Sequence, residues 1–290
     1  MPTQSNRCNQ SKRKGTKKGV RILRVFKKNC KSAAYTAAFI RAGILASACA
    51  AIVIAPSTSS AEGQASSINW DGQYVGVSAG LSRATAKPSV NAKGTTYFNA
   101  IDQNQLDPLA SHNHKSTNFT GTLFGGFNRQ VGNVVLGLEG DFSLVDFDEQ
   151  HTVNNVAYTS LPGRRFSMTT DVEAKWMASL RPRLGYAQDK SLFFVSAGPA
   201  LSRFKYNFTF ADEAPRSTSV SKNKLKVGVA AGLGYEYRFH DTWSLKAEYL
   251  FSDFNIGKAS SALTTSTADG FNHKVDFTTN HFRIGVVKAF

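Results

Sequence analysis

The larger part of this 290-residue sequence contains no cysteine. The three cysteines, Cys8, Cys30 and Cys49, all lie within the first 61 residues. The remaining residues therefore cannot form a disulfide scaffold, a cysteine-ligated zinc site or a thiol nucleophile.

The first 61 residues, in turn, have no acidic side chain. They hold twelve of the 35 lysines and arginines and none of the 20 aspartates and glutamates, while the whole chain has a formal net charge of +15. Beyond residue 61 the balance is 23 basic against 20 acidic side chains. This nearly neutral remainder excludes a basic nucleic-acid face, so we expect no nucleic-acid partner.

A hydrophobic run long enough for a membrane-spanning helix is also missing. The apolar run at 42–55 has fourteen residues, whereas a spanning helix needs about 20. A short apolar run after a basic stretch and before small residues is typical of a secretory signal peptide. We expect an extended basic signal peptide over 1–61, cleaved after Ala61, and a periplasmic lead-in over 62–69. Cleavage at 48–50 and a lipoprotein cysteine at Cys49 are the alternatives.

From Trp70 onward the sequence alternates between apolar residues and small or polar ones. In residues 227–239 every odd position is apolar or aromatic, and the even positions are glycine, alanine, glutamate or arginine. This two-residue period predicts a strand with two different faces. Seven further runs of the same kind predict eight strands in all, each of about ten residues. They begin near Val75, Phe119, Val134, Trp176, Phe193, Trp243 and Phe282.

The predicted connections are short at one end and long at the other. Three are tight turns and four are long polar stretches. An even number of antiparallel strands with this layout is typical of a bacterial outer-membrane protein. We therefore predict an all-β fold: a closed eight-stranded antiparallel transmembrane β-barrel over 70–290, with short periplasmic turns and long outer loops. The turns are 130–133, 187–191 and 240–242, and the long stretches are 83–116, 146–171, 207–221 and 255–274.

Periodicity alone does not decide which face of the barrel points outward, because a soluble barrel around a ligand shows the same alternation. Aromatic residues at the predicted strand ends, such as Tyr186, Phe239 and Trp243, favour lipid on the apolar face. Aromatic girdles lie at membrane interfaces. We expect the protein in the bacterial outer membrane.

Several motifs of the predicted barrel resemble one known family. They are WDGQYVG at 70–76, FGGFN at 124–128, VVLGLEGDF at 134–142, RLGYA at 183–187, GLGYEY at 232–237 and the terminal Phe290. Together they resemble the Omp25/Omp31-like small outer-membrane β-barrel proteins of alphaproteobacteria, which include the Bartonella hemin-binding proteins.

The resemblance implies outer-membrane lipid and lipopolysaccharide as surroundings, and a terminal Phe290 that the barrel-assembly machinery reads. Lys288 departs from the family pattern, which prefers an aromatic residue there. Pro182 also departs from it, since a proline removes one donor from the strand ladder.

Nine charged residues share the register opposite to the apolar face. A lysine or arginine facing lipid near mid-bilayer costs roughly 2–4 kcal/mol, which the inward register avoids. Because an eight-stranded barrel encloses only enough room for side chains, we expect these charges to pair as a salt-bridged plug. A gated ion path through the same pairs is the alternative. If the turn at 240–242 is tight, Glu236 lies opposite Lys246. The set is Glu139, Asp141, Arg181, Arg183, Glu236, Arg238, Lys246, Glu248 and Arg283.

Four histidines in the predicted outer loops are candidate hemin ligands: His112, His114, His151 and His273. Imidazole binds haem iron, and the resemblance supports hemin as a ligand. Histidine is also tolerated in polar loops without any ligand. We expect no resident cofactor and no metal site.

No pattern predicts catalysis. GVSAG at 76–80 matches the nucleophile-elbow motif but lies inside a predicted strand with no helix after it. The carboxylates of Glu139 and Asp141 lie beside arginines, which would keep both ionised. We expect a non-enzymatic surface protein that supports envelope integrity and contacts host surface molecules or hemin. The alternative is a small porin with a narrow charged lumen.

Overall fold

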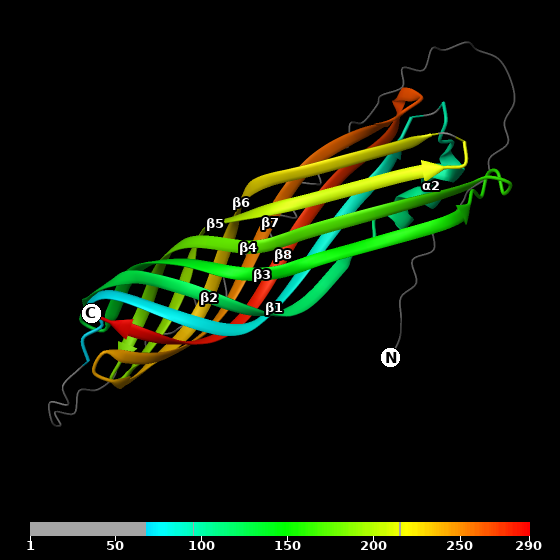
Figure 1. Cartoon of the computed structure of the whole chain (residues 1–290). Helices are drawn as coiled ribbons and strands as arrows, with labels where there is room; N and C mark the ends of the chain where they lie inside the picture. Colours follow the sequence, from blue (N-terminus) through cyan, green and yellow to red (C-terminus); the bar gives the residue numbers. More distant parts are fainter. Residues whose placement is uncertain (1–67, 95, 215) are drawn as a thin grey trace, which may run out of the picture. The chain divides into compact units, whose positions relative to one another are not determined.

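Eight long antiparallel strands close into a barrel (Figure 1). The computed structural model describes residues 68–94, 96–214 and 216–290, and in it each strand pairs with the next while β8 pairs back with β1. The predicted eight-stranded all-β fold is confirmed. The strands are β1 (Gly72–Lys93), β2 (His114–Val131), β3 (Val134–Ala157), β4 (Arg165–Gln188), β5 (Ser191–Asp212), β6 (Ser217–His240), β7 (Trp243–Leu263) and β8 (Ser266–Ala289).

The only helix in the described part of the chain is α2 (Ala100–Ala110), between β1 and β2. No helix among these residues is long and apolar enough to span a membrane. The predicted signal peptide at 1–61, and all of the lead-in except residues 68–69, lie outside the described residues.

Two-residue turns join the strands at one end of the barrel, which we call the short-turn end. They occupy 132–133, 189–190 and 241–242, within the three turns predicted from the sequence. Gly132 has φ +60° and Asp189 has φ +52°. Tight hairpin turns require such left-handed conformations, which glycine and aspartate tolerate.

The strands are much longer than predicted, and the four predicted long loops are largely wrong. Each strand has 18 to 24 residues. At the end opposite the short turns, called the rim here, three connections occupy only 158–164, 213–216 and 264–265, and one, 94–113, is long and contains α2. Apart from these connections, the stretches interpreted as loops are strands whose outward side chains are polar.

The inward face of the barrel changes from polar to apolar partway along most strands, with β2 and β6 as exceptions. On β5, Ser196 and Ser202 face inward nearer the short turn, and Phe204, Phe208 and Phe210 face inward nearer the rim. All five lie on even positions, so the two-residue register continues unbroken while the chemistry changes.

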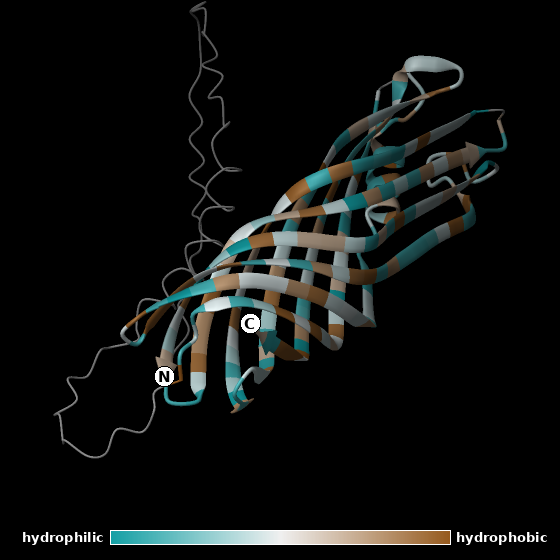
Figure 2. Cartoon of the chain, turned by 60° about the vertical axis from the view of Figure 1, so that its left-hand side comes forward, coloured by the Kyte–Doolittle hydropathy of each residue, from teal (hydrophilic) through white to brown (hydrophobic). Residues whose placement is uncertain are grey.

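The outward face changes in the opposite sense. On β8, Phe282 and Ile284 are each 56% exposed, whereas the outward residues nearer the rim include Asn272 and Lys274. Apolar and polar segments alternate along the strands in Figure 2. An apolar exterior fits lipid and a polar exterior fits water.

The barrel thus has two zones. The membrane half, at the short-turn end, is apolar outside and polar inside; the outer half, at the rim, is polar outside and apolar inside. The change occurs near the inward-facing residues Ser82, Thr120, Ser143, Met177, Ser202, Ala230, Ser252 and Thr279.

Helix α2 is anchored to the rim by its polar residues. The Asn99 side chain accepts hydrogen bonds from the backbone N–H groups of residues 101 and 102, which caps the helix N-terminus. Asp107 accepts the backbone N–H of Ala92 on β1 at 2.7 Å, and Gln105 bonds the β3–β4 connection at Thr159. Leu106 of α2 and nearby Phe98 are fully buried in the apolar interior.

The hydrogen-bonded wall of the barrel is interrupted at two places in the outer half. Pairing between β2 and β3 ends at Thr122 and Ser143, although both strands continue toward the rim. Pairing between β6 and β7 ends at Val229 and Asp253 in the same way. At these places neighbouring strands run on without a shared hydrogen-bond ladder.

Candidate functional site

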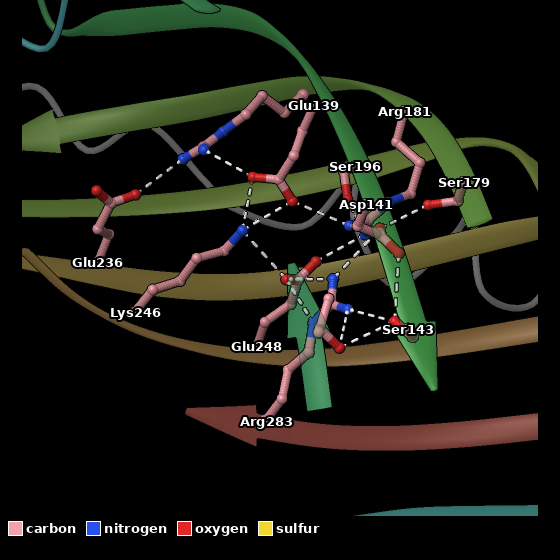
Figure 3. A network of polar contacts seen from close by, with 12 residues as sticks. Glu139, Asp141, Ser143, Ser179, Arg181, Ser196, Glu236, Lys246, Glu248 and Arg283 are labelled. Carbon is pink, nitrogen blue, oxygen red and sulfur yellow. Dashed lines mark hydrogen bonds and ion pairs between the residues drawn. The ribbon is translucent and has the colours of Figure 1, made fainter. Parts of the chain in front are cut away.

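A network of eight buried charges fills the interior of the membrane half (Figure 3). It comprises four carboxylates and four cations, so its formal charges cancel. Every ion pair in it measures 2.6–3.4 Å, and its side chains are at most 4% exposed. Its members are Glu139 and Asp141 from β3, Arg181 and Arg183 from β4, Glu236 from β6, Lys246 and Glu248 from β7, and Arg283 from β8.

Arg181 joins three carboxylates. Its guanidinium lies 3.0 Å from Glu139, 2.7 Å from Asp141 and 2.6 Å from Glu248. It also donates a hydrogen bond to Ser196 of β5. A planar guanidinium with a fixed fork of donors suits this position, because it satisfies several acceptors at once.

Glu139, like Glu248, pairs with three cations. Lys246 lies 2.6 Å away, and Arg183 and Arg181 complete the surroundings together with the hydroxyl of Tyr74, which donates at 2.8 Å. The register places Glu236 opposite Lys246, as the turn at 240–242 predicts. Their ion pairs nevertheless go elsewhere: Glu236 pairs with Arg183 at 3.4 Å.

Arg283 completes the network from β8. It donates to Glu248 at 2.9 Å and approaches Asp141 at 3.4 Å. It also donates to the hydroxyls of Thr122 on β2 and Ser143 on β3. With Tyr74 of β1 and Ser196 of β5, all eight strands contribute a polar side chain to the network.

The ninth predicted charge, Arg238, lies apart from the network. Its guanidinium stacks 4.3 Å from the ring centre of Trp70 and donates to the backbone carbonyl of Asn69 at 2.9 Å. Trp70 itself is 2% exposed and packs with Val135 and Leu192. The chain entering β1 therefore closes the short-turn end of the lumen.

Aromatic side chains fill the interior of the outer half. Phe98, next to α2, lies 5.7 Å from Phe210 and 5.4 Å from Phe271, ring centre to ring centre. Phe204 lies 4.9 Å from Phe277. Together with the charge network and Trp70, this core places buried side chains in the lumen at three successive levels.

The structure corrects the positions of the candidate hemin ligands. Of the four, His112 alone lies in an outer connection; His114 begins β2 and is 4% exposed, and His151 lies within β3. The rings of His112 and His151 stack at 4.1 Å, and that of His114 is 5.8 Å from His112. Burial is the largest cause of the lowered pKa values of His114 and His151.

His273 is wrongly predicted as a loop residue, because it faces inward from β8. It is 2% exposed, and its ring nitrogens bond the Tyr206 hydroxyl at 2.9 Å and the Ser261 hydroxyl at 3.1 Å. Burial lowers the pKa of His273 to about 4. Both ring nitrogens of His273 have hydrogen-bond partners inside the barrel, so we do not group it with the other three histidines as a ligand site.

Phe290 lies at the short-turn end beside β1. Its backbone N–H donates to the carbonyl of Gln73 at 3.0 Å, and its ring is exposed. Lys288, where the family pattern prefers an aromatic, donates to Thr242 and lies 5.1 Å from the ring centre of Trp243. The described residues contain no group of three or more histidine, cysteine, aspartate or glutamate side chains suited to a metal ion.

A closed barrel with an apolar exterior band and a filled, charged interior defines an outer-membrane β-barrel protein. The chain belongs to the family described as outer membrane protein beta-barrel domain, which matches residues 46–290. The protein is accordingly one of the bacterial outer membrane.

Two relatives carry similar names. The 31 kDa outer-membrane immunogenic protein of Brucella melitensis is 31% identical over 192 residues, 66% of this chain and 72% of the relative. The 22 kDa outer membrane protein of Rhizobium leguminosarum is 25% identical over 173 residues, 59% of this chain and 68% of the relative. Among solved structures, OprG from Pseudomonas aeruginosa is 13% identical, covers 76% of this chain and 97% of its own, and has a TM-score of 0.39.

Three groups that fill the lumen were not predicted from the sequence: Tyr74, Trp70 and the aromatic core of the outer half. Tyr74 has the inward register, which could have placed it beside the charges. Trp70 precedes the first strand, so no periodicity indicates its burial. The aromatic core has a clear signal in Phe204, Phe208 and Phe210, which recur at even spacing inside a stretch that otherwise looks polar.

Proposed function

We propose that the protein is a non-conducting structural barrel that supports the integrity of the outer membrane and presents its outer half at the cell surface. One observation carries the proposal: the lumen is filled from the short-turn end to the rim. A porin would need a continuous polar path, and the apolar core of the outer half offers none.

The balanced charge network also supports a structural function. A buried ion pair that loses one partner leaves an uncompensated charge, at a cost of roughly 3–5 kcal/mol. Opening a path through the network would break several pairs at once, since Arg181 alone contacts three carboxylates. The network therefore favours one closed arrangement.

Solute uptake by proteoliposomes tests this proposal. Vesicles that contain the purified protein should swell in isotonic arabinose no faster than vesicles without protein. In cells, deletion of the gene should raise sensitivity to detergent, and the intact gene should restore resistance. Rapid swelling, or a deletion strain with unchanged detergent resistance, would contradict the proposal.

The polar exterior of the outer half is the part we propose for contact with host surface molecules. The relative in Brucella melitensis is named an immunogenic protein, as expected for an exposed surface. A membrane-impermeant amine reagent applied to intact cells should label Lys87 and Lys274 of the outer half, but not Lys190 in a short turn. Labelling of Lys190 in place of Lys87 and Lys274 would contradict the proposed orientation.

Hemin is a second candidate ligand, favoured by the stacked rings of His112 and His151. Hemin added to the purified protein should shift the Soret band, and replacing both histidines with alanine should abolish the shift. His240→Ala, near a short turn, is the matched control and should leave the shift intact. A shift that survives the double substitution would exclude these histidines as ligands.

Export and assembly complete the proposed function. We propose that residues 1–61 are removed as a signal peptide and that Phe290 is read by the barrel-assembly machinery. N-terminal sequencing of the protein from outer membranes should begin at Glu62. Deleting Phe290 should leave unassembled protein in the periplasm, and normal assembly of that variant would contradict the assignment.

A further inference from the structure

A lateral slit opens in the barrel wall between the outer halves of β6 and β7. Its lower end, toward the membrane half, is the last ladder pair, Val229 with Asp253. At its upper end, toward the rim, the backbone N–H of Thr264 donates to the carbonyl of Ser217 at 3.0 Å. The slit is therefore a closed window in the wall, and not a frayed edge.

Lysines dominate the walls of the slit. Lys222, Lys224 and Lys226 occupy alternate positions of β6, on the register that faces inward elsewhere on this strand. Lys258 lines the slit from β7. The side chains that line its middle include no aspartate or glutamate among the described residues, and Asp253 of β7 lies at its lower end. The floor holds Phe204 and Val275, together with Tyr206 and His273.

Lys226 reaches across the slit to β7. A Cβ placed on Gly257 would lie 2.9 Å from the Lys226 ammonium, and Gly257 has φ +101° within a register shift of β7. The glycine thus leaves room for the ammonium at the opening. Side chains two residues apart on a strand are separated by roughly 7 Å, so the three β6 lysines spread positive charge over about 13 Å.

The lower part of the slit meets the apolar exterior band. Leu225 and Val227 of β6 face outward and are 49% and 69% exposed, beside Lys224 and Lys226. The lysines therefore begin where the lipid-facing surface ends. Anionic groups at that level of an outer membrane belong to the headgroups of outer-leaflet lipids.

We propose that the slit binds the phosphate groups of an outer-leaflet glycolipid. The acyl chains of the lipid lie in the bilayer against Leu225 and Val227, and its phosphates enter among Lys222, Lys224 and Lys226. Charge complementarity selects a lipid whose phosphates give it a net negative charge over a zwitterionic one, in which an ammonium balances the phosphate. The apolar floor favours a ligand that remains attached to the membrane.

The same lysines have a simpler interpretation. Unpaired strand edges invite pairing with other chains, and edge lysines suppress it. This alternative requires positive charge but no ligand. Lipid binding and self-association therefore separate the two interpretations.

Binding to the full chain purified in zwitterionic detergent tests the proposal, with native mass spectrometry as the readout. The probes are bisphosphorylated lipid A, the same lipid without phosphates, and inorganic pyrophosphate. The test variant replaces Lys222, Lys224 and Lys226 with glutamine. The control variant replaces Lys87, Lys115 and Lys190, which do not line the slit, and so removes the same charge.

The wild-type and control proteins should bind bisphosphorylated lipid A about tenfold or more tightly than the test variant does, since a basic residue near anionic lipid contributes about a factor of five. Dephosphorylated lipid should bind all three proteins equally. Equal binding of lipid A to all three would overturn the proposal, as would equally tight binding of pyrophosphate, which would indicate a free phosphate ligand. Self-association of the test variant with unchanged lipid binding would leave only the protection of a strand edge.

Discussion

At the scale of single residues, Arg181 determines how the interior of the membrane half is arranged. It lies between Glu139, Asp141 and Glu248, each within 3.0 Å, and its side chain is fully buried. No other cation of the network contacts three carboxylates. The guanidinium therefore compensates acids from two strands, β3 and β7, that face each other across the lumen.

Arg181→Ala should lower the free energy of unfolding by roughly 3–5 kcal/mol, because it leaves buried carboxylates uncompensated. Urea unfolding of the protein in lipid vesicles measures the change. Arg203→Ala, at an exposed position on β5, should change it by less than about 0.5 kcal/mol. Equal effects of the two substitutions would mean that the network does not stabilise the barrel.

His273 should make the outer half sensitive to acid. Burial lowers its pKa from an ordinary value of 6.5 to about 4, so the unfolded chain binds a proton at a higher pH than the folded chain does. Stability from this group is complete above pH 6.5 and is lost as the pH falls toward 4, by roughly 3 kcal/mol in total.

Urea midpoints between pH 4 and 7.5, compared for the wild type and His273→Phe, isolate this dependence. The wild type should lose stability relative to the variant as the pH falls through this window. A constant difference between the two proteins across the window would contradict the buried, neutral histidine.

At the scale of elements, the sequence predicts the strands of the membrane half well and those of the outer half poorly. In the membrane half, apolar residues face outward and contrast with glycine and charge, as in 227–239. In the outer half, the outward residues are those of an ordinary polar surface, and the signal of a strand is the alternate spacing of inward apolar residues, as in Phe204, Phe208 and Phe210. Polarity is a poor guide there, since both loops and water-facing strands are polar.

Helix α2 could not be placed from periodicity, because its buried contribution is small and its anchors are polar. The Asn99 cap and Asp102 form a capping box that the sequence does contain.

The ion-pair partners could not be predicted from the sequence either. The register gives Glu236 opposite Lys246, but side-chain reach decides that Lys246 pairs with Glu139.

Phe98→Ala should detach α2 from the aromatic core. Phe98 is fully buried against Phe210 and Phe271, so its loss costs roughly 3–5 kcal/mol. Hydrogen exchange of the α2 amides should then accelerate. Ile101→Ala, at a side chain that is 53% exposed, is the control and should leave the exchange rates unchanged. If both substitutions accelerated exchange, the position of α2 would depend on the total apolar surface of this segment and not on the burial of Phe98.

At the scale of the whole molecule, the reversal of inside and outside between the two zones defines where lipid ends. Leu233 faces outward in the membrane half, and Asn272 faces outward in the outer half. Introducing arginine at these two sites should therefore have different consequences. Leu233→Arg should cost up to roughly 2–4 kcal/mol, and Asn272→Arg close to nothing.

Unfolding of both arginine variants in lipid vesicles and in detergent checks this difference. The cost at position 233 should appear in vesicles and shrink in detergent, where water reaches the introduced charge. An equal, small effect at both positions in vesicles would contradict the assignment of the apolar band to lipid.

The most direct test of the central claim, a lumen sealed along its whole length, is current recording from the purified protein in a planar lipid bilayer. Trp70, the charge network and the aromatic core should together keep the wild-type protein silent in concentrated potassium chloride. A steady nanosiemens conductance from the wild-type protein would show an open path through the barrel and would contradict the claim.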